Sequence, residues 1–181
     1  MATRNILTDG DRGLLKKSRI VKDFNKRLHI LLDDMRETLI EANGLGLAAP
    51  QVGVLRRVAL IVDISLETES LEEQIIELVN PEIIGRDGEQ TGSEGCLSVP
   101  GVYGIVTRPE SVIIKAQDRH GEPFELEGTE LTARAVCHEL DHLDGVVFTS
   151  IAERFLTEEE IAELGAKNEQ ENEEEEESEQ Q

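Results

Sequence analysis

The stretch His138-Glu139-Leu140-Asp141-His142 carries the strongest structural and chemical signal in this chain of 181 residues. The apolar spacing around it predicts a helix over residues 132–143 that ends at Asp144-Gly145. Histidines at positions i and i+4 project from one face of a helix, which is the spacing that two imidazoles need to bind one metal ion. Glu139 lies near enough to polarise a water molecule without being a ligand. The plainer alternative is a pair of packed or solvent-facing histidines.

A catalytic metal site typically has three protein ligands and one open position. Zinc metallopeptidases with the HExxH pattern take their third ligand from downstream, but no histidine follows His142, Glu153 is too close, and Glu163 falls in the acidic C-terminal region. Upstream, Cys96 lies in the glycine-bearing segment EGCLS at 94–98, which suits a thiolate brought up to a metal. A lone cysteine is more often a small core residue, but the nearby metal motif favours Cys96 as the third ligand.

The rest of the chain predicts an α+β fold with mixed, mainly antiparallel sheets around the helix that carries the HExxH motif. Apolar residues at spacings of three and four predict an N-terminal amphipathic helix over 22–42, capped by Asp23 and ended by Asn43-Gly44. The remaining patterns predict a strand over 57–64 buried on both faces, a second strand at 75–84 broken at Asn80-Pro81, a turn-rich loop over 85–92, and a hairpin of strands 111–117 and 123–127. Cys137 points about 100° away from His138 around the helix, so we expect it to pack in the core.

Charge divides the chain into two parts. Residues 157–181 contain 12 Glu and 1 Lys and so hold −11 of the net charge of −21. We expect residues 1–156 to form one catalytic domain, and residues 157–181 to form a short helix followed by a disordered acidic tail. Both parts repel phosphate at long range, which disfavours DNA and anionic membranes as partners. No apolar run is long enough to span a bilayer, and no signal peptide is recognisable, so we expect a cytoplasmic protein.

The segment GLGLAAPQ at 44–51 matches the dinucleotide fingerprint G-x-G-x-x-A in letters only. That fingerprint follows a strand and opens a helix, whereas here a helix precedes the segment and Pro50 stands where the next helix would begin. One interpretation is a helix stop followed by a tight turn. The other is that glycines without Cβ atoms let an extended peptide approach the backbone, with Gln51 offering an amide donor.

Taken together in this order, GLGLAAPQ at 44–51, EGCLS at 94–98 and HELDH at 138–142 resemble the three signature motifs of the peptide deformylase family. These metalloenzymes remove the formyl group from nascent bacterial polypeptides. The resemblance covers about residues 4–156. The proline usual near the N-terminus of the family is missing around residues 8–11, and the acidic tail lies outside the family pattern.

The resemblance implies roles for particular residues of this chain. Cys96, His138 and His142 bind the metal, and Glu139 is the general acid and base. Gln51 and the backbone N–H of Leu97 stabilise the oxyanion, while Gly46 and Gly95 contact the substrate backbone. We add Leu45, Leu131 and Ala135 as residues of an apolar pocket for the methionine side chain.

The resemblance also implies a substrate and a metal. The substrate is a nascent polypeptide with an N-terminal N-formylmethionine, and the products are formate and the free amine. The implied metal is Fe²⁺, with Ni²⁺, Zn²⁺ or Co²⁺ as substitutes, whereas the residues alone support only a metal that tolerates thiolate and imidazole ligands. Two alternatives are a zinc metallopeptidase, which lacks its downstream ligand here, and an inactive peptide-binding homologue, which the intact Glu139 and Gln51 disfavour. Ribosome association is not readable from the sequence.

Overall fold

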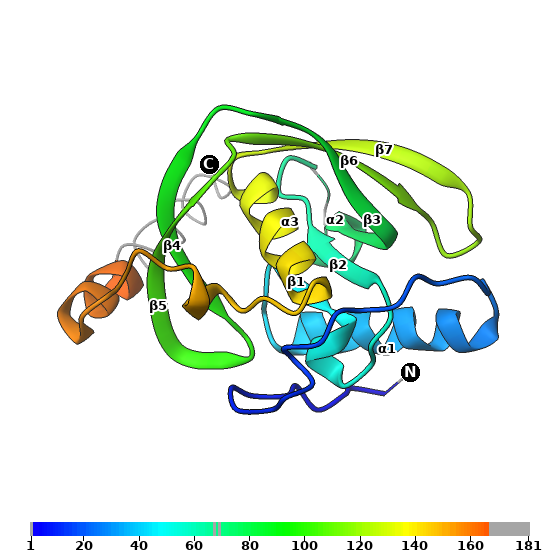
Figure 1. The fold of residues 1–181 in the computed structure, drawn as a ribbon, viewed down its shortest axis with the longest axis horizontal. Coiled ribbons are helices and arrows are strands. Elements are labelled where there is room, and N and C mark those ends of the chain that lie inside the picture. The colour runs from blue at the N-terminus through cyan, green and yellow to red at the C-terminus, as the bar shows by residue number, and fades with distance from the viewer. Residues whose placement is uncertain (1, 67, 69, 167–181) are drawn as a thin grey trace, which may run out of the picture.

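Helix α3 lies between two sheets in the computed structural model, which describes residues 2–66, 68 and 70–166 (Figure 1). One sheet has the strand order β1-β2-β3-β6-β7 and the other the order β4-β5-β8. The labelled helices are α1 (Lys26–Glu41), α2 (Leu71–Gln74) and α3 (Glu130–Leu143), with 3₁₀ turns at Ala49–Val52 and Phe148–Ser150. The strands are β1 (Gly46–Ala48), β2 (Val58–Val62), β3 (Ile75–Asp87), β4 (Gln90–Cys96), β5 (Val99–Arg108), β6 (Ser111–Gln117), β7 (Pro123–Thr129) and β8 (Arg154–Phe155).

The sheets are antiparallel, so the predicted α+β class is confirmed while the predicted mixed character is not. Every pair among the named strands of the described residues runs antiparallel. Within residues 2–66, 68 and 70–166, parallel pairing is limited to one isolated bridge between Arg19 and Arg56. The connections explain this, because neighbouring strands such as β6 and β7 are joined by a short turn, and antiparallel strands need no longer crossover.

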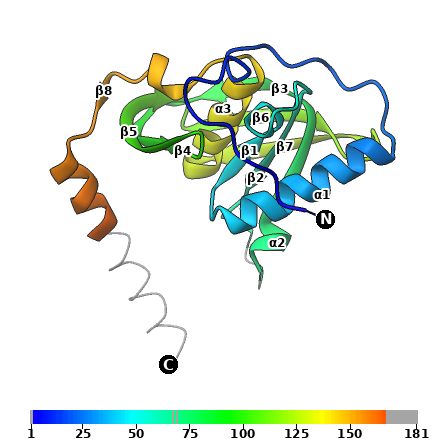
Figure 2. The same cartoon turned by 90° about the horizontal axis from the view of Figure 1, so that it is seen from below.

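Strand β2 is the centre of the fold, and all five of its residues are buried. Its side chains alternate between two cores, as the period of two in a strand requires. Val58, Leu60 and Val62 pack toward α1, whereas Ala59 and Ile61 pack toward α3. Figure 2 shows α1 on the opposite side of the five-stranded sheet from α3. The prediction of a strand buried on both faces is therefore correct.

The N-terminal helix is shorter than predicted. Helix α1 begins at Lys26 because the side chain of Asn25 accepts hydrogen bonds from the backbone N–H groups of Arg27 and Leu28, so Asp23 is not the cap. Phe24 precedes the helix but still packs against the same core. The helix ends at Glu41, and Asn43 has a left-handed backbone with φ of +49°, close to the predicted stop at Asn43-Gly44.

The predicted break at Asn80-Pro81 is present as a bulge within one continuous strand, whereas the predicted loop over 85–92 is wrong. Strand β3 continues from Ile75 to Asp87, with a shift of register between Val79 and Glu82. Asn80 makes the bulge possible, because its side-chain amide accepts a hydrogen bond from the N–H of Val21 and donates to the carbonyl of Val21. After a turn at Gly88, β4 begins at Gln90, so most of the predicted loop is strand.

Three further local predictions can be compared with the structure. The hairpin of residues 111–117 and 123–127 is confirmed as β6 and β7, and β7 extends to Thr129. The HExxH helix begins two residues earlier than predicted, at Glu130. Within 44–53, the segment forms strand β1 and a 3₁₀ turn rather than a plain turn, and Pro50 lies inside that turn.

Beyond the predicted catalytic domain, residues 158–166 are helical. The predicted acidic tail from residue 169 onward lies outside the described residues. Among the residues that the structure does describe, no helix combines the length and apolar character needed to cross a membrane.

Candidate active site

Three potential metal ligands come together from two elements that are far apart in the sequence. Cys96 ends strand β4, and His138 and His142 lie one turn apart on α3. One ligand atom from each of the three residues lies within 4.8 Å of the other two. Sγ of Cys96 is 3.2 Å from Nε2 of His142. The structure thus gathers the three residues that the sequence predicts as ligands.

The donor set fits a divalent transition metal. One thiolate and two imidazoles suit Zn²⁺, Fe²⁺, Co²⁺ or Ni²⁺ better than Mg²⁺ or Ca²⁺, which prefer oxygen ligands. Nδ1 of His138 is 3.0 Å from Oε2 of Glu94. Because a carboxylate only accepts hydrogen bonds, Nδ1 carries the hydrogen and Nε2 is left for the metal. Burial lowers the pKa of His142 to about 3, which keeps that imidazole neutral, as a ligand must be.

Glu139 is a buried carboxylate beside the ligands. Its side chain lies against Gly46 of β1: a Cβ atom at position 46 would come within 2.5 Å of Oε1 of Glu139. Oε2 of Glu139 is buried and makes no hydrogen bond to any of the described residues. Burial raises the pKa of Glu139 to about 7. A carboxyl group with that pKa can take up and return a proton near neutral pH.

Gln51 is held with its amide turned toward Cys96. Its Oε1 accepts a hydrogen bond from the backbone N–H of Ala48 at 2.8 Å, which fixes the orientation of the amide. Its Nε2 then donates to Oγ of Ser98 at 3.2 Å and to Sγ of Cys96 at 3.6 Å. Gln51 is 1% exposed, so the sequence prediction of an amide donor near the site agrees with where the structure places this group.

A cavity of about 600 Å³ opens beside these groups. Its walls come from the β1 region, from the β4–β5 hairpin and from α3. All five residues that the sequence predicts to contact the substrate line it, together with Gln51, Leu97, Cys96, His138 and Glu139; the five are Leu45, Gly46, Gly95, Leu131 and Ala135. Leu45 and Leu131 are 43% and 39% exposed and present apolar side chains at this surface.

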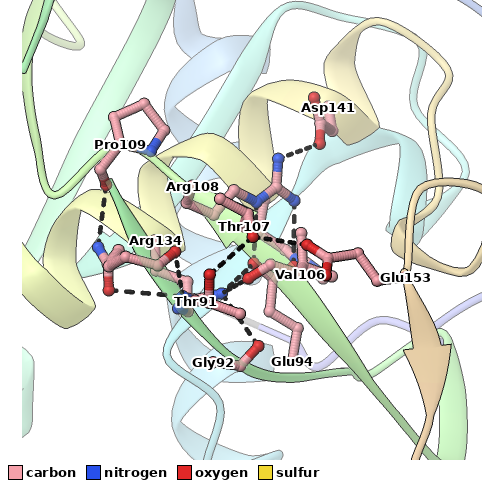
Figure 3. A network of polar contacts seen from close by, with 12 residues as sticks. Thr91, Gly92, Glu94, Val106, Thr107, Arg108, Pro109, Arg134, Asp141 and Glu153 are labelled. Carbon is pink, nitrogen blue, oxygen red and sulfur yellow. Dashed lines mark hydrogen bonds and ion pairs between the residues drawn. The ribbon is translucent and has the colours of Figure 1, made fainter. Parts of the chain in front are cut away.

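Sequence reasoning missed the polar network behind the ligands, which Figure 3 shows. Glu94 pairs with Arg108 through both carboxylate oxygens, at 2.8 and 3.0 Å, and with Arg134 at 2.9 Å. Burial opposes ionisation of Glu94, but hydrogen bonds from His138 and Arg108 outweigh it and lower the pKa of Glu94 to about 2. Asp141 accepts a hydrogen bond from Arg108 at 2.6 Å. Through Glu94, which accepts the hydrogen bond from Nδ1, this network fixes the orientation of the His138 ring.

Burial also affects the pKa values of the His138 imidazole and of the Cys137 thiol on α3. It disfavours the charged form of His138, whereas hydrogen bonds to Cys96 and Glu94 favour that form and raise the pKa of His138. A metal ion at Nε2 would take the place of the proton there, because metal binding releases the proton of its ligand. Cys137, by contrast, lies in the core cluster between α3 and the larger sheet, and burial raises the pKa of its thiol. The prediction that Cys137 packs in the core is confirmed.

Comparison with known proteins agrees with this geometry. The family model for polypeptide deformylase matches residues 3–156. The peptide deformylase of Caldicellulosiruptor bescii is 53% identical over 169 residues, which cover 93% of this chain and 97% of that protein. Peptide deformylase 1 of Bacillus subtilis is 48% identical, over 91% of this chain and 99% of that protein.

Solved structures show the same fold. A peptide deformylase from Legionella pneumophila superposes with a TM-score of 0.77 at 43% identity, over 84% of this chain and 87% of that one. The Met-ala-ser-bound class I type b peptide deformylase from Acinetobacter baumannii superposes with a TM-score of 0.75 at 32% identity, over 82% and 98%. With a family match over most of its length and close relatives that it covers almost completely, this chain belongs to the polypeptide deformylase family, whose members are metal-dependent hydrolases that remove the N-formyl group from nascent peptides.

Proposed function

We propose that the residues around the cavity hydrolyse the formyl amide of polypeptides that begin with N-formylmethionine, and that Cys96, His138 and His142 hold one Fe²⁺ ion, which Ni²⁺, Zn²⁺ or Co²⁺ can replace. The observation that carries the proposal is the convergence of three ligand atoms next to Glu139 on α3. Cys96, His138 and Glu139 line one cavity. A divalent cation bound there supplies a Lewis acid that polarises the formyl carbonyl and makes water more acidic.

Glu139 is the proton carrier of the proposed reaction. Its carboxylate takes a proton from the attacking water, whose oxygen forms a bond to the formyl carbon. As the bond between that carbon and the peptide nitrogen breaks, Glu139 returns the proton to the nitrogen, and formate and a free amine leave. A pKa of about 7 suits both transfers, because the group loses and regains a proton at little cost near neutral pH.

The amide of Gln51 and the backbone N–H of Leu97 stabilise the negative charge that develops on the formyl oxygen. Donors that are oriented before the reaction are effective because they need no reorganisation as charge develops. The hydrogen bond from Ala48 to Oε1 of Gln51 supports this role, since it directs Nε2 toward the side of Cys96. Leu97 follows Cys96 directly and lines the same cavity.

Separate groups of residues bind the methionine side chain and the peptide backbone of the substrate. Leu45, Leu131 and Ala135 provide the apolar surface for the methionine side chain, because burying such a side chain is worth about 1.5–3 kcal/mol. Gly46 and Gly95 let the peptide backbone approach the walls closely. Both glycines lack room for a side chain: a Cβ atom would come within 2.5 Å of Glu139 at position 46 and within 2.7 Å of Tyr103 at position 95. The related Acinetobacter enzyme was crystallised with Met-ala-ser, a peptide of the expected product class.

The proposed catalytic domain is residues 1–156, with residues 157–181 as an appendage to it. The family match ends at residue 156, and the residues of the cavity all precede it. The partners of this domain are nascent polypeptides rather than DNA or membranes, and the substrate class puts the activity in the cytoplasm, where such polypeptides are made.

Metal content and formate release together test the proposal. Protein purified without oxygen is expected to carry one iron per chain and to release one formate for each N-formylmethionyl peptide consumed. Chelation should abolish the release, and Fe²⁺ or Ni²⁺ should restore it. Formate release that persists at full rate after the metal has been removed, with metal analysis as the check, would exclude a metal-dependent site.

A further inference from the structure

Arg134 is a buried arginine to which the proposed reaction gives no role. It lies on α3, one turn before His138, and its side chain is 8% exposed. Its guanidinium reaches across to the smaller sheet. There Nη1 donates to Oε1 of Glu94 and to the carbonyl of Val106, both at 2.9 Å, and Nη2 donates to the carbonyl of Gln90 at 3.3 Å. A single side chain of α3 thus binds both β4 and β5 (Figure 3).

The carboxylate of Glu94 is bound on all sides by this arrangement. Oε1 accepts hydrogen bonds from Nε of Arg108 and from Nη1 of Arg134, and Oε2 accepts from Nη2 of Arg108 and from Nδ1 of His138. A carboxylate offers about four acceptor sites, so all of them are in use. Arg108, on β5, donates hydrogen bonds to both oxygens of Glu94. Arg134 and His138 lie four residues apart on α3, and each donates to one of these oxygens.

These hydrogen bonds to Glu94 affect the position of the metal ligand Cys96. Glu94 and Cys96 are two residues apart at the end of β4, whereas His138 and His142 lie on α3. The relative placement of β4 and α3 therefore determines whether the thiolate meets the two imidazoles. Two residues of α3 set this placement directly at Glu94: Arg134 and, four residues later, the ligand His138 itself.

Gly92 supports the same reading. A Cβ atom at position 92 would come within 3.2 Å of Nη2 of Arg134. The guanidinium therefore lies directly against the backbone of β4, two residues before Glu94. Arg134 contacts Gln90, Gly92 and Glu94 and so fixes β4 up to two residues before Cys96. A shift of register lies between Glu94 and Cys96.

We propose that Arg134 is a positioning residue of the metal centre, which fixes strand β4 on helix α3 so that the thiolate of Cys96 meets His138 and His142. The inference rests on the ligand set of the proposed function and adds a residue outside it. Residues behind the ligands of a metal site typically change metal affinity or activity by about 10–100-fold when they are replaced. A residue with a merely structural role lowers the melting temperature but leaves the metal–thiolate bond of the folded protein unchanged.

The test uses the full chain loaded with Co²⁺, whose absorption bands report thiolate ligation directly. Arg134→Met removes every donor and keeps an apolar stem, and Arg134→Lys keeps the charge with a single donor point. Arg36→Met is the matched control, because Arg36 also pairs with a glutamate, Glu77, and with backbone carbonyls of another part of the fold. Each protein is measured for the intensity of the cobalt–thiolate band, for the rate of Co²⁺ loss to a chelator, and for melting temperature.

We expect Arg134→Met to lose Co²⁺ about 10–100 times faster than wild type and to show a weaker or shifted thiolate band. The rate of Co²⁺ loss and the thiolate band of Arg134→Lys should lie between those of Arg134→Met and wild type. Those of Arg36→Met should match wild type. A cobalt–thiolate band and a rate of Co²⁺ loss equal to those of wild type in folded Arg134→Met would overturn the inference. If Arg134→Met does not fold, wild-type values in Arg134→Lys would overturn it. Absence of a thiolate band in the wild-type protein would instead contradict the ligand set of the proposed function.

Discussion

Replacing Glu139 by glutamine is expected to lower the rate of formate release by a factor of about 100 to 10,000 while the metal content stays unchanged. The amide has nearly the same shape as the carboxylate, so the packing against Gly46 is kept. It cannot, however, accept a proton from water and return it to the leaving nitrogen. The ligands Cys96, His138 and His142 are untouched, so metal analysis and a formate assay on the same preparation separate the two effects.

Glu125→Gln is the matched control for this variant. Glu125 lies on β7 and is exposed to solvent, so the same change of charge there should leave turnover as in wild type. Turnover of Glu139→Gln within a few-fold of wild type, with metal bound, would remove Glu139 from its proposed role.

The second large effect is expected at Cys96. Cys96→Ala removes one of three ligands together with its negative charge, and metal affinity depends on both. We expect the purified variant to contain little or no metal and to release no formate above background. Metal analysis after gel filtration measures the metal content, and the formate assay measures turnover.

The chain offers its own control in its other cysteine. Cys137 is buried and packs between α3 and the larger sheet, away from the ligand atoms. Cys137→Ala should therefore keep its metal and its turnover and lose only some stability, since a small buried group has been removed. A full complement of metal in Cys96→Ala would show that a different residue supplies the third ligand.

The sequence predicts the parts of this structure whose signals are local. The spacing of His138 and His142 is a property of one helix, and the buried run that forms β2 is a property of one strand, so both can be read from neighbouring residues. The hairpin of β6 and β7 is likewise marked by its own turn. For the same reason two of the ligands could be read from one short motif, and the structure brings their ligand atoms and that of Cys96 within 4.8 Å of one another.

The parts that sequence reasoning missed depend on contacts between distant segments. Strand β4 is polar, because one face of it carries Glu94 toward Arg108 and Arg134, and no local pattern distinguishes such a strand from a loop. The bulge at Asn80 depends on Val21, which lies 59 residues away. One signal was present in the sequence: Arg134 precedes the ligand His138 by four residues and so shares its helix face, where a charged residue needs a partner.

The central claim is that the site acts on a formyl group, and one peptide made in formylated, acetylated and free-amine forms tests it most directly. An acetyl group adds a methyl where water, Gln51 and the N–H of Leu97 converge, and its carbonyl carbon is less electrophilic. A misfit of only a few kcal/mol at the reacting atom lowers the rate by about 100-fold or more. With metal-loaded protein and mass spectrometry over time, we expect the formylated peptide to lose its formyl group, the acetylated peptide to react at least about 100 times more slowly, and all internal peptide bonds to survive. Equal rates on the formylated and acetylated peptides, or fragments from cleavage within the chain, would contradict the account.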